Sequence, residues 1–174
     1  MGYKIEVFNL KETVRLLLKA GCKFHSRPTN IGNTALHTAV ELESEELVDE
    51  LLRGGAPATV WNSRGLTAMH MAVEKRNKEL LRLLVNYEYC VNDANLDTVN
   101  ARNLAGHTVL GAAIREGWLQ GVCIALGAGA SVTMKACEGD TALHIAAQLG
   151  NVDILQEIIK VSKLISIIDL RNEN

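Results

Sequence analysis

The sequence predicts an all-α solenoid, in which helix-turn-helix repeats stack on their neighbours. One phrase recurs four times in the 174 residues, as "GNTALHTAV" from Gly32, "GLTAMHMAV" from Gly65, "GHTVLGAAI" from Gly106 and "GDTALHIAA" from Gly139. The Thr of this phrase recurs after 33, 41 and 33 positions. Self-similarity at such a period indicates a repeat architecture, because each unit buries its apolar face only against the next.

A second apolar pattern at helical spacing follows each phrase. The four patterns are "EELVDELLRGGA" from Glu45, "KELLRLLVNYEY" from Lys78, "LQGVCIALGAGA" from Leu119 and "VDILQEIIKVSK" from Val152. In the first of them, the apolar residues recur at the three- and four-residue spacing that places them on one face of a helix. Each unit is therefore expected to contain a short helix, a tight turn and a longer helix.

The residues between the helices agree with these boundaries. The Gly of each phrase permits a tight turn, and the Thr two places later is a helix N-cap whose hydroxyl accepts a backbone N–H. Gly55 and Gly129 are expected to end the longer helices in a left-handed conformation. A small residue recurs where neighbouring helices must approach closely, at Ala39, Ala72, Ala113 and Ala146.

Bulk properties exclude several classes of function. A net charge of -2 and a pI near 6.2 provide no overall field for a phosphate backbone, so no direct nucleic-acid partner is expected. The four Cys and five His show neither a CxxC pair nor an HExxH motif, so we expect no metal and no cofactor. Short apolar runs and the absence of a leader predict no membrane segment and a location in the cytoplasm or nucleus.

The recurring phrase resembles the ankyrin repeat, whose period is 33 and whose signature is G-x-T-P-L-H-x-A-A. The signature Pro is replaced by Ala or Val in all four phrases, and the signature His is replaced by Gly111 in the third phrase. The resemblance implies one domain over residues 1–174, with full repeats at 30–62, 63–103, 104–136 and 137–163. Partial capping units are expected at 1–29 and 164–174, and an insertion at 86–101.

Nothing in the sequence predicts catalysis, so we expect no enzyme and no catalytic residue. His37, His70 and His144 each lie three residues after the phrase Thr, which is the His position of the repeat. We interpret them as neutral imidazoles that bridge backbone groups of adjacent repeats; the alternative is an acid–base or metal-binding role.

The resemblance implies a protein-binding surface built from the residues around each turn Gly and those after each first helix. These positions are Asn30, Ile31, Asn33, Glu41 and Leu42; Ser63, Arg64, Leu66, Glu74 and Lys75; Leu104, Ala105, His107, Arg115 and Glu116; and Cys137, Glu138, Asp140, Gln148 and Leu149. Their mixed chemistry favours a protein partner over a polyanion.

Two local features extend this surface. The segment Glu41 to Glu50 holds six acids in ten residues, including Glu43, Glu45 and Glu46. It is interpreted either as ordinary helix capping on a solvated face or as a docking surface for a basic segment. Trp118, at the start of the third unit's longer helix, is either a core residue or an exposed anchor for a partner, and Trp61 has the same ambiguity. Gly121 is expected to mark close packing.

A second resemblance concerns the long interval before the third phrase. An ankyrin stack with an insertion here, then "NLAGHTVL" from Asn103 and "GWL" from Gly117, is similar to the inhibitors of NF-κB. The resemblance implies binding to a Rel homology dimer, masking of its basic nuclear-localisation segment and loss of its DNA binding. The chain lacks the D-S-G-x-x-S motif of signal-degraded members, so we expect a constitutive inhibitor, like the short versions carried by some insect viruses.

Two alternatives remain open at the level of sequence. Small ankyrin proteins also regulate protein kinases of the cell cycle, and others are general adaptors. The insertion itself is either an extension of the preceding helix or a surface loop, and it is either neutral or a contact with the partner.

Overall fold

The repeated phrase and its companion pattern fold into a stack of helix pairs. The structure, a computed structural model, describes residues 12–13, 15–16, 32–90, 98–136 and 139–172. The helices within this described part are α2 (Ala35–Glu41), α3 (Glu45–Arg53), α4 (Ala68–Glu74), α5 (Lys78–Cys90), α6 (Val109–Arg115), α7 (Leu119–Gly127), α8 (Ala142–Gln148) and α9 (Val152–Asn172). The predicted all-α solenoid is confirmed.

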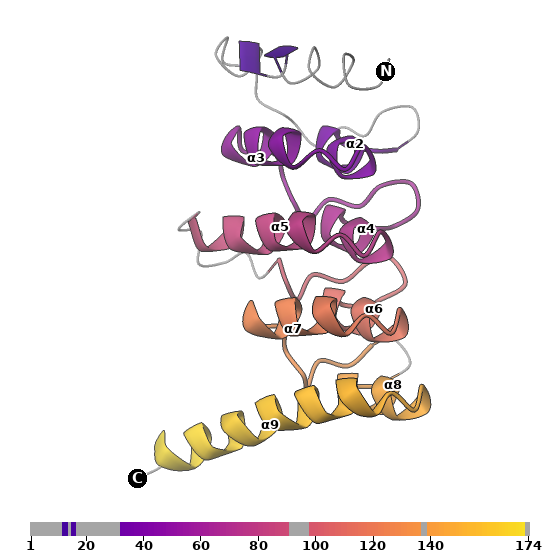
Figure 1. The fold of residues 1–174 in the computed structure, drawn as a ribbon, viewed down its shortest axis with the longest axis vertical. Helices are drawn as coiled ribbons and strands as arrows, with labels where there is room; N and C mark the ends of the chain where they lie inside the picture. The colour runs from indigo at the N-terminus through magenta and orange to yellow at the C-terminus, as the bar shows by residue number, and fades with distance from the viewer. Residues whose placement is uncertain (1–11, 14, 17–31, 91–97, 137–138, 173–174) are drawn as a thin grey trace.

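The helices form two layers that run the length of the stack. The short helices α2, α4, α6 and α8 pack in succession in one layer, and α3, α5, α7 and α9 pack in the other (Figure 1). Within each pair, the chain reverses direction at a short turn, and a longer connection then leads to the next pair. The core therefore lies between the layers and between successive pairs.

Hydroxyl groups at the predicted positions begin the short helices. Thr34, Thr67 and Thr108 adopt extended backbone conformations and accept a hydrogen bond from the N–H three residues later. These bonds satisfy backbone donors that the first turn of a helix leaves unpaired. The longer helices α3 and α5 are capped in the same way by Ser44 and Asn77.

The core consists of the apolar faces that the sequence pattern indicates. In α3, four residues are at most 2% exposed, namely Leu47, Val48, Leu51 and Leu52. The recurring small residue of each phrase is equally buried, at Ala39, Ala72, Ala113 and Ala146. Gly55 and Gly129 follow α3 and α7 with φ of 78° and 85°, so the predicted left-handed helix ends are confirmed.

Two buried histidines join successive repeats. His37 Nε2 lies 2.9 Å from the carbonyl oxygen of Leu66, and His70 Nε2 lies 3.0 Å from that of His107. A carbonyl only accepts, so each Nε2 carries the proton, and each Nδ1 accepts from the hydroxyl of the cap Thr at 2.7 Å. The predicted neutral bridging role is confirmed for these two residues.

The insertion begins as a continuation of a helix. α5 has 13 residues, whereas α3 and α7 have nine each, so residues 87–90, within the expected insertion at 86–101, extend the longer helix of the second full repeat. Residues 91–97 lie outside the described part of the chain. The chain is described again at Thr98 and Val99, which are 5% and 4% exposed, and a repeat turn follows at Asn103.

The C-terminal end of the stack differs from the expected cap, whereas nearly all of the expected N-terminal cap lies outside the described residues. The expected partial repeat 1–29 lies almost wholly outside the described residues, but Arg15 donates from Nε to Glu50 Oε1 of α3 at 2.6 Å. At the other end, α9 is a single helix of 21 residues, and the predicted boundary at 163/164 falls inside it. Residues 164–172 thus continue a helix, because no helix-ending Gly follows Lys160. Among the helices described, none is long and apolar enough to cross a membrane.

Candidate protein-binding surface

Between successive helix pairs, the chain forms tight turns that we call fingers. In the finger at residues 61–66, the N–H of Asn62 donates to the carbonyl oxygen of Leu66, and the N–H of Gly65 donates to that of Asn62, both at 2.9 Å. The Asn62 side-chain oxygen also accepts from the N–H groups of Arg64 and Leu66. Asn103 makes the same two backbone bonds with His107 and Gly106 in the finger at 102–107, and Ala136 makes them with Asp140 and Gly139 in the next finger.

Adjacent fingers are bonded to each other. The N–H of Leu104 donates to the carbonyl oxygen of Gly65 at 2.7 Å, and Trp61 Nε1 donates to that of Arg102 at 2.8 Å. Gly65 is required at this contact, because its φ is 72° and a Cβ there would overlap Leu104. The fingers at 61–66 and 102–107 are therefore held directly against each other in a row along the stack.

Each of three fingers also bonds the end of its own short helix. Asn33 Nδ2 donates to Glu41 at 3.1 Å, Arg64 Nη2 to Glu74 at 2.9 Å, and Gln148 Nε2 to Asp140 at 3.2 Å. All six residues are among the predicted variable positions. The row of fingers together with the ends of α2, α4, α6 and α8 is called the finger surface below.

The other predicted contact residues vary in exposure. Leu104 and Leu149 are 67% and 51% exposed, although both are large and apolar. Leu66 and His107 are only partly exposed, because their carbonyls face the bridging imidazoles. Four of the predicted contact residues lie outside the described part of the chain, namely Asn30, Ile31, Cys137 and Glu138.

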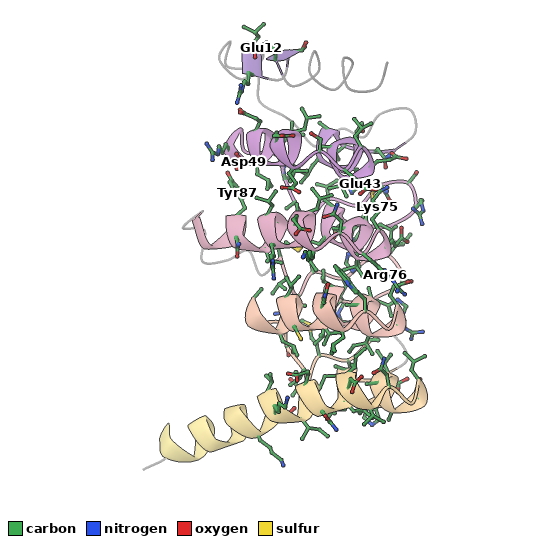
Figure 2. All side chains as sticks on the ribbon, in the orientation of Figure 1. Glu12, Glu43, Asp49, Lys75, Arg76 and Tyr87 are labelled. Carbon is green, nitrogen blue, oxygen red and sulfur yellow. The ribbon has the colours of Figure 1, made fainter. Side chains whose placement is uncertain are left out.

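A second row of polar contacts follows the turns within the helix pairs. Glu43 lies 3.5 Å from Lys75 Nζ and accepts from Asn77 Nδ2 at 3.2 Å, and Arg76 Nη2 donates to the Glu116 carbonyl oxygen at 2.5 Å. Figure 2 shows Glu43, Lys75 and Arg76 along the same edge of the stack. These contacts link each turn to the next repeat.

Two residues in this row hold a strained backbone conformation. Glu43 and Arg76 have φ of 52° and 51°, while Gly117 and Gly150 occupy the same position in later repeats. A non-glycine residue in the left-handed region costs about 1 kcal/mol or more. Sequence reasoning missed Arg76 as part of the surface, although the Gly in the later repeats was the available signal.

The acidic run is divided among several contacts. Glu41 accepts from Asn33 on the finger surface, and Glu43 accepts from Asn77 in the row of turns. Asp49 pairs with Arg53, and Glu50 pairs with Arg15. Glu45 and Glu46 remain as the exposed acids of the first turn of α3, where they favour the helix dipole, and Glu46 accepts from Ser44 Oγ at 3.4 Å. The six acids therefore do not form one uniform patch, and their interpretation as a docking surface for a basic segment stays a prediction.

The two tryptophans have opposite environments. Trp118 is 8% exposed, and its ring covers Gly121 so closely that a Cβ at Gly121 would overlap it. Trp118 is thus a core residue, because Gly121 in α7 has no side chain and leaves room for the ring. The alternative of an exposed anchor is wrong. Trp61 is 48% exposed on a finger, an outcome that the sequence left open.

The site carries one strongly perturbed titratable group. Burial lowers the pKa of His70 to about 4, against the opposing effect of its bond to the His107 carbonyl. Burial also lowers the pKa of His37. His144 is exposed and bonds the hydroxyl of Thr141 through Nδ1 at 2.8 Å. Within the described residues, no three His, Cys, Asp or Glu side chains are grouped as metal ligands.

A groove also lies in the layer of longer helices. It has a volume of about 540 Å³ between α5 and α7, and its lining includes Lys78, Arg82, Leu119 and Cys123. None of the predicted contact residues lines it. The groove is therefore separate from the finger surface.

The fold and the finger surface define a repeat solenoid that presents a long, mixed polar and apolar face. Residues 4–96 match the family described as Ankyrin repeats (3 copies), and residues 138–172 match Ankyrin repeat. The chain belongs to the ankyrin-repeat family, whose repeats are protein–protein interaction modules.

Two known proteins are similar to this chain. An ankyrin repeat protein of Fowlpox virus (strain NVSL) is 37% identical over 86 residues, which are 49% of this chain and 25% of that protein. B-cell lymphoma 3 protein homolog of Mus musculus is 30% identical over 158 residues, which are 88% of this chain and 34% of that protein. The chain thus spans a quarter to a third of the length of these relatives.

Proposed function

We propose that this chain acts as an inhibitor of the NF-κB type, which binds and sequesters a Rel homology dimer. The observation that carries the proposal is the long second interval, 41 positions from Thr67 to Thr108, which includes the start of "NLAGHTVL" and is followed by "GWL". The similarity to B-cell lymphoma 3 protein homolog, which covers 88% of this chain, supports it. Such an inhibitor acts in the cytoplasm or nucleus, where its partner resides.

The finger surface provides the physical basis for this binding. Polar pairs at three fingers fix side chains that are otherwise flexible, so less conformational entropy is lost when a partner binds. Trp61 and Leu104 add exposed apolar area between these pairs, and aromatic anchors dominate the energetics of many interfaces. A folded protein partner of comparable length fits this combination better than a small ligand.

Charge favours a basic segment near the second repeat. Glu45 and Glu46 are exposed at the N-terminus of α3, beside the row formed by Glu43 and Lys75. The exposed carboxylates attract a cationic segment and raise its association rate most at low salt. In the resembled family, early repeats bind the basic nuclear-localisation segment of the Rel factor.

A charge reversal with a matched control tests the proposal. Glu46 and Glu79 both lie 12 residues after the cap Thr, in the first turns of α3 and α5. We expect Glu46→Lys to weaken binding to a purified Rel homology dimer by about fivefold at low salt, and much less at high salt. Glu79→Lys has the same effect on the helix dipole and is expected to leave binding nearly unchanged.

The readout is calorimetric titration of the dimer at two salt concentrations. Equal effects of the two variants would contradict the docking of a basic segment on α3. A wild-type chain that shows no binding to the Rel dimer, and that retains only a protein kinase from an extract, would overturn the proposal in favour of the kinase alternative.

A further inference from the structure

The C-terminal end of the stack has the residues of an internal repeat. Positions two, 14 and 18 residues after the cap Thr hold Leu36, Val48 and Leu52 in the first full repeat, Met69, Leu81 and Val85 in the second, Leu110, Val122 and Leu126 in the third, and Leu143, Leu155 and Ile159 in the last. All twelve are apolar. The last repeat thus keeps the pattern with which other repeats contact their successors.

The exposure of these positions changes at the end of the stack. In the first and second repeats all six side chains are at most 4% exposed, and in the third Leu110 and Val122 are at most 1% exposed while Leu126 is partly buried. In the last repeat Leu143 and Leu155 are only partly buried, and Ile159 is 41% exposed. The helices α3, α5 and α7 each have a following helix packed on them, whereas α9 is the last helix of the described stack (Figure 1).

His144 provides a polar counterpart to this apolar face. Its Nδ1 accepts from Thr141, as the Nδ1 atoms of His37 and His70 accept from their own cap Thr. The Nε2 atoms of His37 and His70 reach a finger carbonyl of the next repeat, while His144 Nε2 has no partner among the described residues. The ring is thus already oriented for a carbonyl that a further finger would supply.

We propose that the face formed by Leu143, His144, Leu155 and Ile159 is a docking surface for one further ankyrin repeat. The repeat packs its helix pair on α8 and α9 as these pack on α6 and α7, and its finger carbonyl accepts from His144 Nε2. Continuity with the existing interfaces between repeats identifies this occupant.

A tandem duplication tests the proposal within one polypeptide. In this variant, a second copy of residues 128–160 follows Lys160 directly and precedes the native residues 161–174, which adds one period of 33 residues in register. Since each repeat adds its interface to the stability of the stack, the midpoint of thermal unfolding is expected to rise by about 5 °C or more.

A charged substitution at Ile159 distinguishes docking on this face from a gain in thermal stability that has another cause. Ile159→Glu is expected to leave the thermal midpoint of the native chain within about 2 °C, because the side chain is already exposed. The same substitution in the first copy of the duplicated chain should remove the gain. Val85 lies at the equivalent position of an internal repeat, so Val85→Glu in the native chain should lower the midpoint sharply. That result would show that this position is buried wherever a following repeat packs on it.

Sedimentation of the native chain excludes the alternative occupant. A monomer at all concentrations supports the proposal. A dimer that dissociates on Ile159→Glu would show that a second copy occupies the face and would overturn it. A duplicated chain that unfolds at the same or a lower temperature, or that fails to fold, would overturn it as well. None of these outcomes depends on the Rel partner.

Discussion

Two glycines inside short stretches of helix have opposite surroundings. Gly111 replaces the repeat's His in α6, and a Cβ there would meet Thr108 Oγ1 at 3.5 Å and Ile145 Cδ1 at 3.8 Å, both ordinary contacts. A small cavity of about 10 Å³ lies beside it. Gly121 in α7, by contrast, lies directly beneath the Trp118 ring. The same residue type is therefore replaceable at one position and required at the other.

We predict that Gly111→Ala stabilises the protein by about 1 kcal/mol, because Ala favours the helix and fits the available space. Gly121→Ala should destabilise it by about 1 to 3 kcal/mol, since the Trp118 ring must move. Urea unfolding of both variants measures the difference. Two effects of the same sign would contradict the packing described around Trp118.

The buried His70 makes stability depend on pH. Its pKa is about 4 in the folded chain, against 6.5 for an unperturbed His. The folded state therefore binds fewer protons than the unfolded state, so the stabilisation is present above pH 6.5 and is lost as pH falls toward 4. This difference in the pKa of His70 corresponds to about 3 kcal/mol in the free energy of unfolding.

We predict that urea unfolding at pH 7 and at pH 4.5 shows a large loss of stability in the native chain. His70→Gln retains a donor for the His107 carbonyl but does not titrate, so its stability should change less between the two pH values. If both proteins lost the same stability, His70 would not be the group responsible.

Residue types alone could not predict all of these environments. The cap Thr residues and the bridging His residues were predictable, because their roles depend on backbone geometry within one repeat and its neighbour. Trp61 and Trp118 could not be separated in the same way. Their burial depends on which ring an adjacent helix accommodates, and Gly121 gave only an indirect indication.

At the scale of elements, the fingers depend on one close backbone approach. Gly65 has a φ of 72° and contacts Leu104 of the next finger. Gly55 has a φ of 78°, but the position that a Cβ would take there is open. Both positions are strained for Ala, but only Gly65 lacks room for a Cβ. Their comparison separates backbone strain from packing between fingers.

We predict that Gly55→Ala costs about 1 kcal/mol of stability, which is the strain of a non-glycine residue in the left-handed region. Gly65→Ala should cost at least about 1 kcal/mol more, because it also displaces Leu104. Thermal unfolding of the two variants tests this order. Equal costs would mean that the fingers do not pack on each other as described.

The helix lengths were only partly predictable. The apolar period predicted where α3 and α7 begin and end, since a Gly follows each of them closely. For α5 and α9 no such Gly follows. The sequence left both a longer helix and a surface loop open after α5, and it predicted a capping unit at 164–174 after α9. In the structure both helices continue, which agrees with the general rule that a helix persists until a residue ends it.

At the scale of the whole molecule, the surface is organised by repeats rather than by runs of sequence. The acidic run from Glu41 to Glu50 is continuous in sequence, but its members face a finger, a turn, Arg15 and solvent in succession. The variable positions that the family pattern implied are distant in sequence, yet three pairs of them meet on the finger surface. Contacts between repeats, such as Glu43 with Lys75, depend on stacking and were not predictable.

The most direct test of the central claim is hydrogen exchange of the chain with and without a bound Rel homology dimer. When the dimer is bound, we expect slower exchange at residues 61–66 and 102–107 and at the ends of α2 and α4, with little change at the groove between α5 and α7. Protection confined to that groove, or no protection anywhere in the presence of the dimer, would show that the finger surface does not bind the dimer.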